Sequence, residues 1–151
     1  WGFDHPDFRS QFATQDIDDI YADYFTLLNQ AVKSRLFDIV GHLDLIKIWG
    51  HRPVKKPILA YVEPVLNTIK AAGMVVEINS SGLRKAVREI YPAQQILELM
   101  LAFNIPITLG SDAHHPAQLG EGLEEAVGLA KEVGYRQLVT FAVRKRQLLE
   151  I

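Results

Sequence analysis

Four short apolar runs alternate with segments of helical character, and this alternation limits the possible folds more than any other feature of the sequence. The runs cover residues 37–40, 74–78, 105–109 and 138–141. Each run is apolar at nearly every position and rich in Val and Ile, which is typical of strands buried on both faces of a parallel sheet. The short joints predict an α/β fold with a parallel sheet and helices outside it.

Helices are expected in the intervals between these runs. They are predicted over residues 14–35, 63–74, 92–104 and 117–134. Apolar residues in the first of them recur near helical spacing, and Thr14 or Asp16 can cap its start. Pro64 suits a first helical turn and Gly73 suits a helix C-terminus, which favours a second helix that begins near Pro64.

The length and the opening of the chain bear on its domain organisation. The 151 residues amount to one domain or to part of a larger one. The sequence opens at Trp1 without Met, and turn-rich residues follow. Four strands cannot close a barrel. We therefore expect residues 1–151 to be the C-terminal part of a single, longer domain.

Charge and composition argue against several classes of protein. The formal net charge of −2 gives no electrostatic case for binding to nucleic acid or to an anionic membrane. The chain has no cysteine, so any metal must be bound by His, Asp or Glu. No apolar run approaches the ~20 residues of a membrane span. These features favour a cytoplasmic protein.

Polar side chains follow three of the apolar runs, at the C-terminal ends of the predicted strands. They are His42 and Asp44, Asn79 and Ser80, and Asp112 and His114. In parallel β/α barrels the active site is built at this end of the strands. The sequence therefore predicts that a functional site, if there is one, lies here.

The stretch "GHLD", residues 41–44, allows two interpretations. Gly41 permits a sharp turn, after which His42 can project as a metal ligand with Asp44 as its hydrogen-bonded orienter or as a second ligand. The alternative is a histidine hydrogen-bonded within a strand–helix turn.

The stretch "SDAH", residues 111–114, combines a carboxylate with an imidazole. On an extended strand end Asp112 and His114 would point to the same side, and together they suit Zn, Mn or Fe. Alternatively, Ser111 or Asp112 caps the following helix. His115 lacks the alternating register and is interpreted as a loop residue.

Two cationic residues are candidates for binding an anion. In "EINSSGLRK", residues 77–85, Arg84 carries a planar fork that suits phosphate, although a plain turn with solvated Arg84 and Lys85 is the alternative. Glu77 in the same strand can point inward or outward. Lys47 follows His42 closely and can meet an anionic substrate or be solvated. Asp4 and His5, near the chain start, favour a structural role.

Four stretches, in this order, closely resemble the polymerase and histidinol phosphatase (PHP) family, and its histidinol-phosphatase branch best. They are "FDIVGHLDLI", "VEINSSGLRK", "YPAQQILELM" and "ITLGSDAHHPAQLG". The resemblance covers essentially the whole chain. Its specificity lies in the order and spacing of the GHLD, EINSSGLRK and SDAH motifs together.

The resemblance implies a distorted seven-stranded β/α barrel with three metal ions at the C-terminal strand ends. The chain would form about four β/α units at the C-terminal side of that barrel. The resemblance implies that His42, Asp112 and His114 bind metal and that Arg84 and Lys47 hold the substrate phosphate. The family's His-x-His motif and its other ligands precede this region. A complete site would therefore need an N-terminal part of the same protein.

The implied activity is that of a metal-dependent phosphoric monoester hydrolase. The expected substrate is L-histidinol phosphate, and the expected pathway is histidine biosynthesis, an amino-acid biosynthesis route. The partners are then a small phosphate ester and the N-terminal part, with no nucleic acid and no membrane. Two alternatives stay open: hydrolysis of a nucleotide or another phosphoester, and a non-catalytic fragment that requires the N-terminal half.

Overall fold

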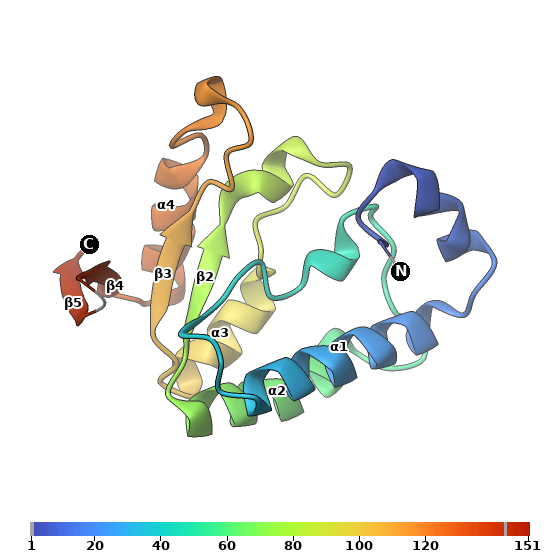
Figure 1. Ribbon diagram of the computed structural model, residues 1–151, viewed down its shortest axis with the longest axis horizontal. Coiled ribbons are helices and arrows are strands. Elements are labelled where there is room, and N and C mark those ends of the chain that lie inside the picture. The colour runs from blue at the N-terminus through green and yellow to red at the C-terminus, as the bar shows by residue number, and fades with distance from the viewer. Residues whose placement is uncertain (1, 144) are drawn as a thin grey trace.

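The structure is a computed structural model that describes residues 2–143 and 145–151; Trp1 and Arg144 lie outside the described residues. Its main sheet has three parallel strands in the order β1-β2-β3. The strands are β1 (Ile39–Val40), β2 (Val75–Asn79) and β3 (Ile107–Gly110). This arrangement confirms the predicted parallel sheet, and it places the C-terminal ends of all three strands at one edge (Figure 1).

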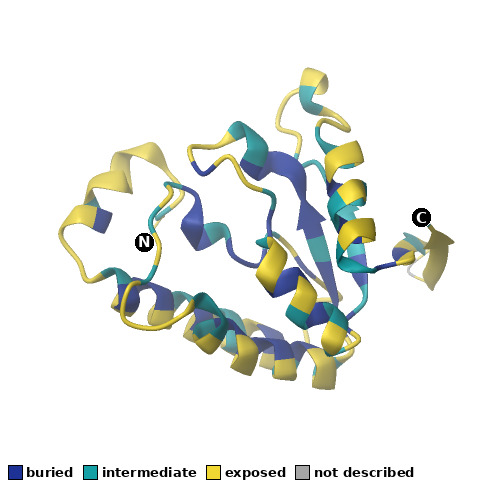
Figure 2. Cartoon of the chain, turned by 180° about the vertical axis from the view of Figure 1, so that it is seen from behind, coloured by how far each residue is buried: buried dark blue, intermediate teal, exposed yellow. Residues whose placement is uncertain are grey.

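The described residues form four α-helices. They are α1 (Ile17–Lys33), α2 (Ile58–Ala72), α3 (Gln94–Ala102) and α4 (Leu123–Val133). Helix α2 connects β1 to β2, and α3 connects β2 to β3. The helices α1 and α2 run side by side, and α3 packs against α4 (Figure 1). Figure 2 shows the reason for this packing, since buried residues line the inner side of α1 and α2 while their outer side is exposed. Among the described residues, none of the helices has the length and apolar character that a bilayer crossing requires.

The helix boundaries confirm two of the capping predictions and correct a third. Asp16 caps α1 by accepting a hydrogen bond from the Asp18 amide, and Gly73 ends α2 with a left-handed φ of 65°. The prediction that α2 begins near Pro64 is wrong, because α2 already begins at Ile58 and Pro64 lies inside it. The apolar residues that precede Pro64 continue the buried face of the helix, and this burial outweighs the lost amide donor.

The run 138–141 forms a strand as predicted, but the prediction that this strand joins the parallel sheet is wrong. Strand β4 (Gln137–Ala142) does not extend the parallel sheet but pairs antiparallel with β5 (Lys145–Glu150) in a separate two-stranded sheet. This hairpin lies beyond β3, away from the helices α1 and α2 (Figure 1). Every residue of β5 is exposed. A partner strand next along the chain satisfies the hydrogen bonds of β4, and the apolar pattern of 138–141 cannot distinguish this pairing from a parallel one.

The first predicted strand is shorter and more exposed than its apolar pattern indicates. Only two residues of the run 37–40 pair with β2, and β1 forms one free edge of the three-stranded sheet, with β3 at the other. Phe37 is 58% exposed and Ile39 is 39% exposed, so the prediction of burial on both faces is wrong there. A cavity of about 180 Å³ lies beside this edge and is lined by Leu28, Ala31, Val32, Phe37, Ile39, Val40, Gly41 and Met74.

Asp18 joins α1 to the loop that precedes α2. Its buried carboxylate accepts hydrogen bonds from the backbone amides of Val54, Lys55 and Lys56 and from the Tyr61 hydroxyl. Burial alone would raise the pKa of Asp18, but these hydrogen bonds hold the pKa at about 2. The carboxylate therefore stabilises the folded state in its charged form.

We expect Asp18→Asn to lower the unfolding midpoint at neutral pH. The folded pKa of Asp18 lies below its ordinary value of 3.8, so this stabilisation is present above about pH 4 and is lost as the pH falls toward 2. The difference between wild type and Asp18→Asn in urea unfolding should therefore shrink over that range. The exposed neighbour provides the control: Asp19→Asn should show little difference at any of these pH values. A pH-independent difference for Asp18→Asn would contradict the account.

Candidate active site

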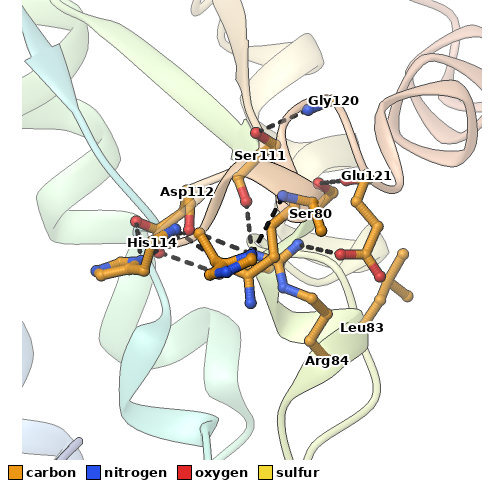
Figure 3. A network of polar contacts seen from close by, with 12 residues as sticks. Ser80, Leu83, Arg84, Ser111, Asp112, His114, Gly120 and Glu121 are labelled. Carbon is orange, nitrogen blue, oxygen red and sulfur yellow. Dashed lines mark hydrogen bonds and ion pairs between the residues drawn. The ribbon is translucent and has the colours of Figure 1, made fainter.

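The carboxyl edge of the parallel sheet brings together the three motifs that the sequence singles out. His42 follows β1, the 3₁₀ turn Ser80–Arg84 follows β2, and Asp112 and His114 follow β3. Figure 3 shows the polar network that connects the last two of these segments. The prediction that the three motifs lie at the same end of the sheet is confirmed, because the parallel register places the C-terminal ends of β1, β2 and β3 side by side.

His42 sits in an unusual environment. Its φ of 27° is positive, which is rare for a residue with a side chain. Its backbone amide donates a hydrogen bond to Glu77 Oε2 at 3.0 Å. Its ring atom Nδ1 is buried and has no hydrogen-bond partner among the described residues. A buried polar nitrogen without a partner is costly, so this atom fits a ligand at the carboxyl edge.

Asp112 and His114 come together, but not through strand alternation. The strand ends at Gly110 and Asp112 has a φ of 49°, so the prediction of an extended end is wrong. Instead, His114 Nδ1 lies 2.9 Å from the backbone oxygen of Asp112 and 3.7 Å from its Oδ1. A carbonyl can only accept, so Nδ1 is the donor of this contact, and in the neutral ring Nε2 then keeps its lone pair. The exposed His114 ring can therefore present Nε2 to a metal.

The alternative of helix capping by Ser111 or Asp112 is wrong, because the Ser111 hydroxyl accepts a hydrogen bond from the Gly120 amide, which lies in the turn before α4. The short 3₁₀ turn Pro116–Gln118 is capped by His115, whose Nδ1 accepts a hydrogen bond from the Ala117 amide. Gly122 precedes α4 and provides no side-chain cap. The Asp112 carboxylate instead accepts a hydrogen bond from the Ser81 hydroxyl. His115 is exposed on the loop, as its lack of alternating register indicates.

Arg84 is directed toward the end of β3 rather than into solvent. Its Nη2 donates to the backbone oxygens of Ser111 at 2.8 Å and Asp112 at 3.2 Å (Figure 3). Its Nη1 is buried and makes no hydrogen bond with the described residues, although it lies 3.5 Å from Glu121 Oε2. Arg84 therefore combines a structural anchor with a partly unused fork beside Asp112, and the alternative of a solvated Arg84 is wrong.

Lys47 lies in a buried ion-pair network. Its ammonium group lies 3.0 Å from Asp44 Oδ2 and 3.2 Å from Glu89 Oε2, and it donates to the Ile90 backbone oxygen. Asp44 also accepts a hydrogen bond from the Ala93 amide. Burial raises the pKa of the Asp44 carboxyl, and the Lys47 ammonium opposes that rise. No hydrogen bond joins Asp44 to the His42 ring. The prediction that Asp44 orients His42 is therefore wrong, and Asp44 pairs with Lys47 instead.

Glu77 is a residue of this edge whose role the sequence leaves open. Its carboxylate crosses the end of the sheet and accepts hydrogen bonds from the His42 amide and from Asn79 Nδ2. The signal in the sequence is an acidic residue inside an otherwise apolar strand. The strand register shows where this side chain lies, because it pairs Gly110 of β3 with Asn79, two residues after Glu77 in β2.

The donor atoms present fit a metal site only in part. The orphaned His42 Nδ1, the Asp112 carboxylate and the His114 Nε2 are borderline and hard donors of the kind that Zn, Mn or Fe accept. Within residues 2–143 and 145–151, however, no three His, Asp or Glu side chains are grouped closely enough to hold a metal ion. The described residues alone therefore do not form a complete metal centre.

Comparison with curated proteins gives three similar relatives. A Deinococcus radiodurans protein named "Probable histidinol-phosphatase" is 40% identical over 147 residues, covering 97% of this chain and 55% of that protein. A Schizosaccharomyces pombe protein of the same name is 33% identical over 67% of this chain and 35% of its own length. The Bacillus subtilis histidinol-phosphatase is 30% identical over 74% of this chain and 45% of its own length. The chain thus spans about half the length of the curated relatives it matches.

Comparison with solved structures supports the fold. A crystal structure of a "putative histidinol phosphatase" from Listeria monocytogenes matches 72% of this chain and 44% of that chain with a TM-score of 0.66. The two sequences are 21% identical, so this likeness shows the α/β fold alone. No family model matches the chain.

Proposed function

Because the chain belongs to the histidinol-phosphatase family, we propose that the protein hydrolyses phosphate monoesters. L-Histidinol phosphate is the proposed substrate, and histidine biosynthesis is the proposed pathway. The observation that carries the proposal is the carboxyl edge of the sheet, where a buried imidazole nitrogen without a partner, an Asp–His pair and a partly buried arginine lie on neighbouring strand ends.

We propose that His42, Asp112 and His114 contribute ligands to a divalent metal site of Zn, Mn or Fe, of which the family resemblance implies three ions. Lewis acidity is the chemistry that such ions supply: it lowers the pKa of water and neutralises charge on phosphoryl oxygens. The Asp112 carboxylate is held by Ser81, and the His114 tautomer is fixed by the Asp112 carbonyl. These contacts orient both donors before any ligand arrives.

Arg84 is proposed to hold the substrate phosphate. The Nη2 hydrogen bonds fix its guanidinium beside Asp112, and Nη1 remains able to donate to a phosphoryl oxygen that replaces Glu121. A charge-assisted hydrogen bond of this kind is strong and gains strength as negative charge grows on the oxygens during transfer. Lys47 keeps its proposed role in phosphate binding only if its contacts with Asp44 and Glu89 open.

Arg84→Ala is expected to raise KM for the phosphate ester and to lower kcat. The loss in kcat/KM should correspond to roughly 2–4 kcal/mol if the guanidinium contacts charge in the transition state. Steady-state phosphate release measures both constants. Lys85→Ala, which removes an exposed cation next in sequence, is the matched control and should leave them nearly unchanged. An unaltered kcat/KM in Arg84→Ala would contradict phosphate binding by Arg84 and would mean that its hydrogen bonds to the end of β3 serve the structure alone.

We further propose that residues 1–151 are one part of a single barrel domain, whose remaining part completes the metal site. Two observations support this arrangement: β1 leaves a free edge with exposed Phe37 and Ile39, and the relatives are about twice as long as the chain. A free, apolar sheet edge is normally covered in a folded protein. A strand from the remaining part is the proposed cover for that edge.

A substrate panel tests the proposed activity. The intact protein, supplied with each metal in turn, should release phosphate from L-histidinol phosphate with a higher kcat/KM than from nucleotides, sugar phosphates or p-nitrophenyl phosphate. A higher kcat/KM for a nucleotide would contradict the proposed substrate and would indicate a nucleotide phosphoesterase. Absence of phosphate release from every ester, with metal bound, would contradict the proposal.

A further inference from the structure

The Glu77 carboxylate forms a bridge across the carboxyl edge of the sheet. Glu77 belongs to the central strand β2, and its Oε2 accepts two hydrogen bonds, one from the His42 amide at 3.0 Å and one from Asn79 Nδ2 at 2.9 Å. The first bond reaches the segment that follows β1, and the second comes from the end of β2 itself. The side chain is thus held in one orientation by two donors.

Two glycines make room for this carboxylate on the flanking strands. A Cβ at Gly110, the last residue of β3, would lie 1.9 Å from Glu77 Oε1 and 2.7 Å from its carboxyl carbon. A Cβ at Gly41, the residue before His42, would lie 3.4 Å from Oε2. The site at Gly110 therefore accepts no side chain while Glu77 keeps its position. The carboxylate is packed between β1 and β3 rather than placed on an open surface.

The hydrogen bond from His42 to Glu77 acts on a strained backbone. His42 has a φ of 27°, a conformation that residues with side chains rarely adopt and that persists only where the surroundings enforce it. Two hydrogen bonds hold the His42 backbone at this point: its amide donates to Glu77, and its carbonyl accepts from the Leu45 amide at 2.9 Å. The direction of the imidazole, with its buried and unpartnered Nδ1, follows from that backbone conformation.

We infer that Glu77 is the positioning residue of the proposed active site: through its bond to the His42 amide it fixes the direction in which the His42 imidazole is presented. The inference rests on the proposed function, because it assigns the imidazole to that site. Glu77 acts here through its oxygen as a hydrogen-bond acceptor, and not as a metal ligand or a general base. Residues that orient ligands in this way typically contribute 10–100-fold to metal affinity or activity.

Two substitutions separate the positioning role from a direct chemical role. Glu77→Ala removes the acceptor and should lower metal affinity or kcat by about 10–100-fold. Glu77→Gln keeps an amide oxygen that can accept both hydrogen bonds and removes the charge, so it should retain most of the wild-type activity. A metal ligand or a general base would lose its function in both variants.

A third substitution displaces the carboxylate without removing it. Gly110→Ala should reduce activity about as strongly as Glu77→Ala, because the new methyl group occupies the place of Oε1. In the Glu77→Ala background the space is vacant, so adding Gly110→Ala should cost little more. The two substitutions are therefore expected to be strongly non-additive in a double-mutant cycle.

Hydrogen exchange of the His42 amide in the intact protein reports on the bond itself, independently of catalysis. The amide should exchange slowly in the wild type and in Glu77→Gln, and faster in Glu77→Ala and in Gly110→Ala. If the wild type releases no phosphate from any ester, the proposed function is wrong. The exchange rate of the His42 amide and the metal affinity of the variants still test the positioning role of Glu77 in that case. Glu77→Gln with full amide protection but the metal affinity or activity of Glu77→Ala would overturn the inference. Wild-type values in Glu77→Ala would overturn it as well.

Discussion

His114→Ala is expected to lower phosphate release by the intact protein by more than about 100-fold, since removing a residue that merely orients a ligand already costs 10–100-fold. The reason is the lone pair on Nε2, which the bond from Nδ1 to the Asp112 carbonyl leaves unused. Loss of this donor should also lower the amount of bound metal, measured by elemental analysis after gel filtration.

The neighbouring histidine supplies the matched control for this prediction. His115→Ala removes an imidazole one position away that is also exposed and accepts a hydrogen bond from the Ala117 amide. Its kcat/KM and bound metal should stay within about twofold of wild type, as is usual for surface substitutions. Equal losses in both variants would mean that the loop, and not the His114 ring, matters. Wild-type metal content and turnover in His114→Ala would contradict the ligand assignment.

Asp112→Asn and His42→Ala extend the same test to the other strand ends. Both should lose bound metal and turnover while circular dichroism shows the wild-type fold, because neither side chain belongs to the hydrophobic core.

Residues 1–151 expressed alone are expected to lack phosphatase activity and to associate with themselves. The physical reason is the free edge of β1 with its exposed apolar residues and the absence, among the described residues, of three grouped metal ligands. Weak metal binding should accompany the loss of activity, because the donors of this part form only a fraction of a site.

Addition of the remaining part of the protein, expressed separately, should restore tight metal binding and phosphate release. A variant with Phe37→Asp at the β1 edge should reduce this restoration, since it places a charge where the partner strand is proposed to pack. Val54→Asp, which alters another exposed apolar residue, in the loop that precedes α2, should not. A monomeric 151-residue protein with full phosphatase activity would contradict the account.

The sequence predicts the three-stranded parallel sheet well because buried parallel strands leave a continuous apolar pattern, as in β2. It fails at β4, where the same apolar pattern serves an antiparallel hairpin with the exposed strand β5. It also fails at β1, where the apolar residues Phe37 and Ile39 face outward. A run of apolar residues records a preference for burial, but it does not say which strand provides the cover.

The positions of the candidate residues follow from the sequence, but their interactions do not. The ends of β1, β2 and β3 are predicted together because parallel strands share an edge. The left-handed backbone of Asp112 replaces the predicted extended strand end. The contact of Lys47 with Glu89 and the hydrogen bond from the His42 amide to Glu77 join residues that are distant in sequence, 35 positions apart in the second case. Such contacts leave no local pattern.

The most direct test of the central claim is phosphate release from L-histidinol phosphate by the intact protein, measured together with bound metal in the wild type and in His42→Ala. The account predicts metal-dependent release by the wild type that a chelator abolishes, and loss of both metal and release in His42→Ala. Release that continues at the wild-type rate in His42→Ala would contradict the claim that the carboxyl edge of this sheet is the active site.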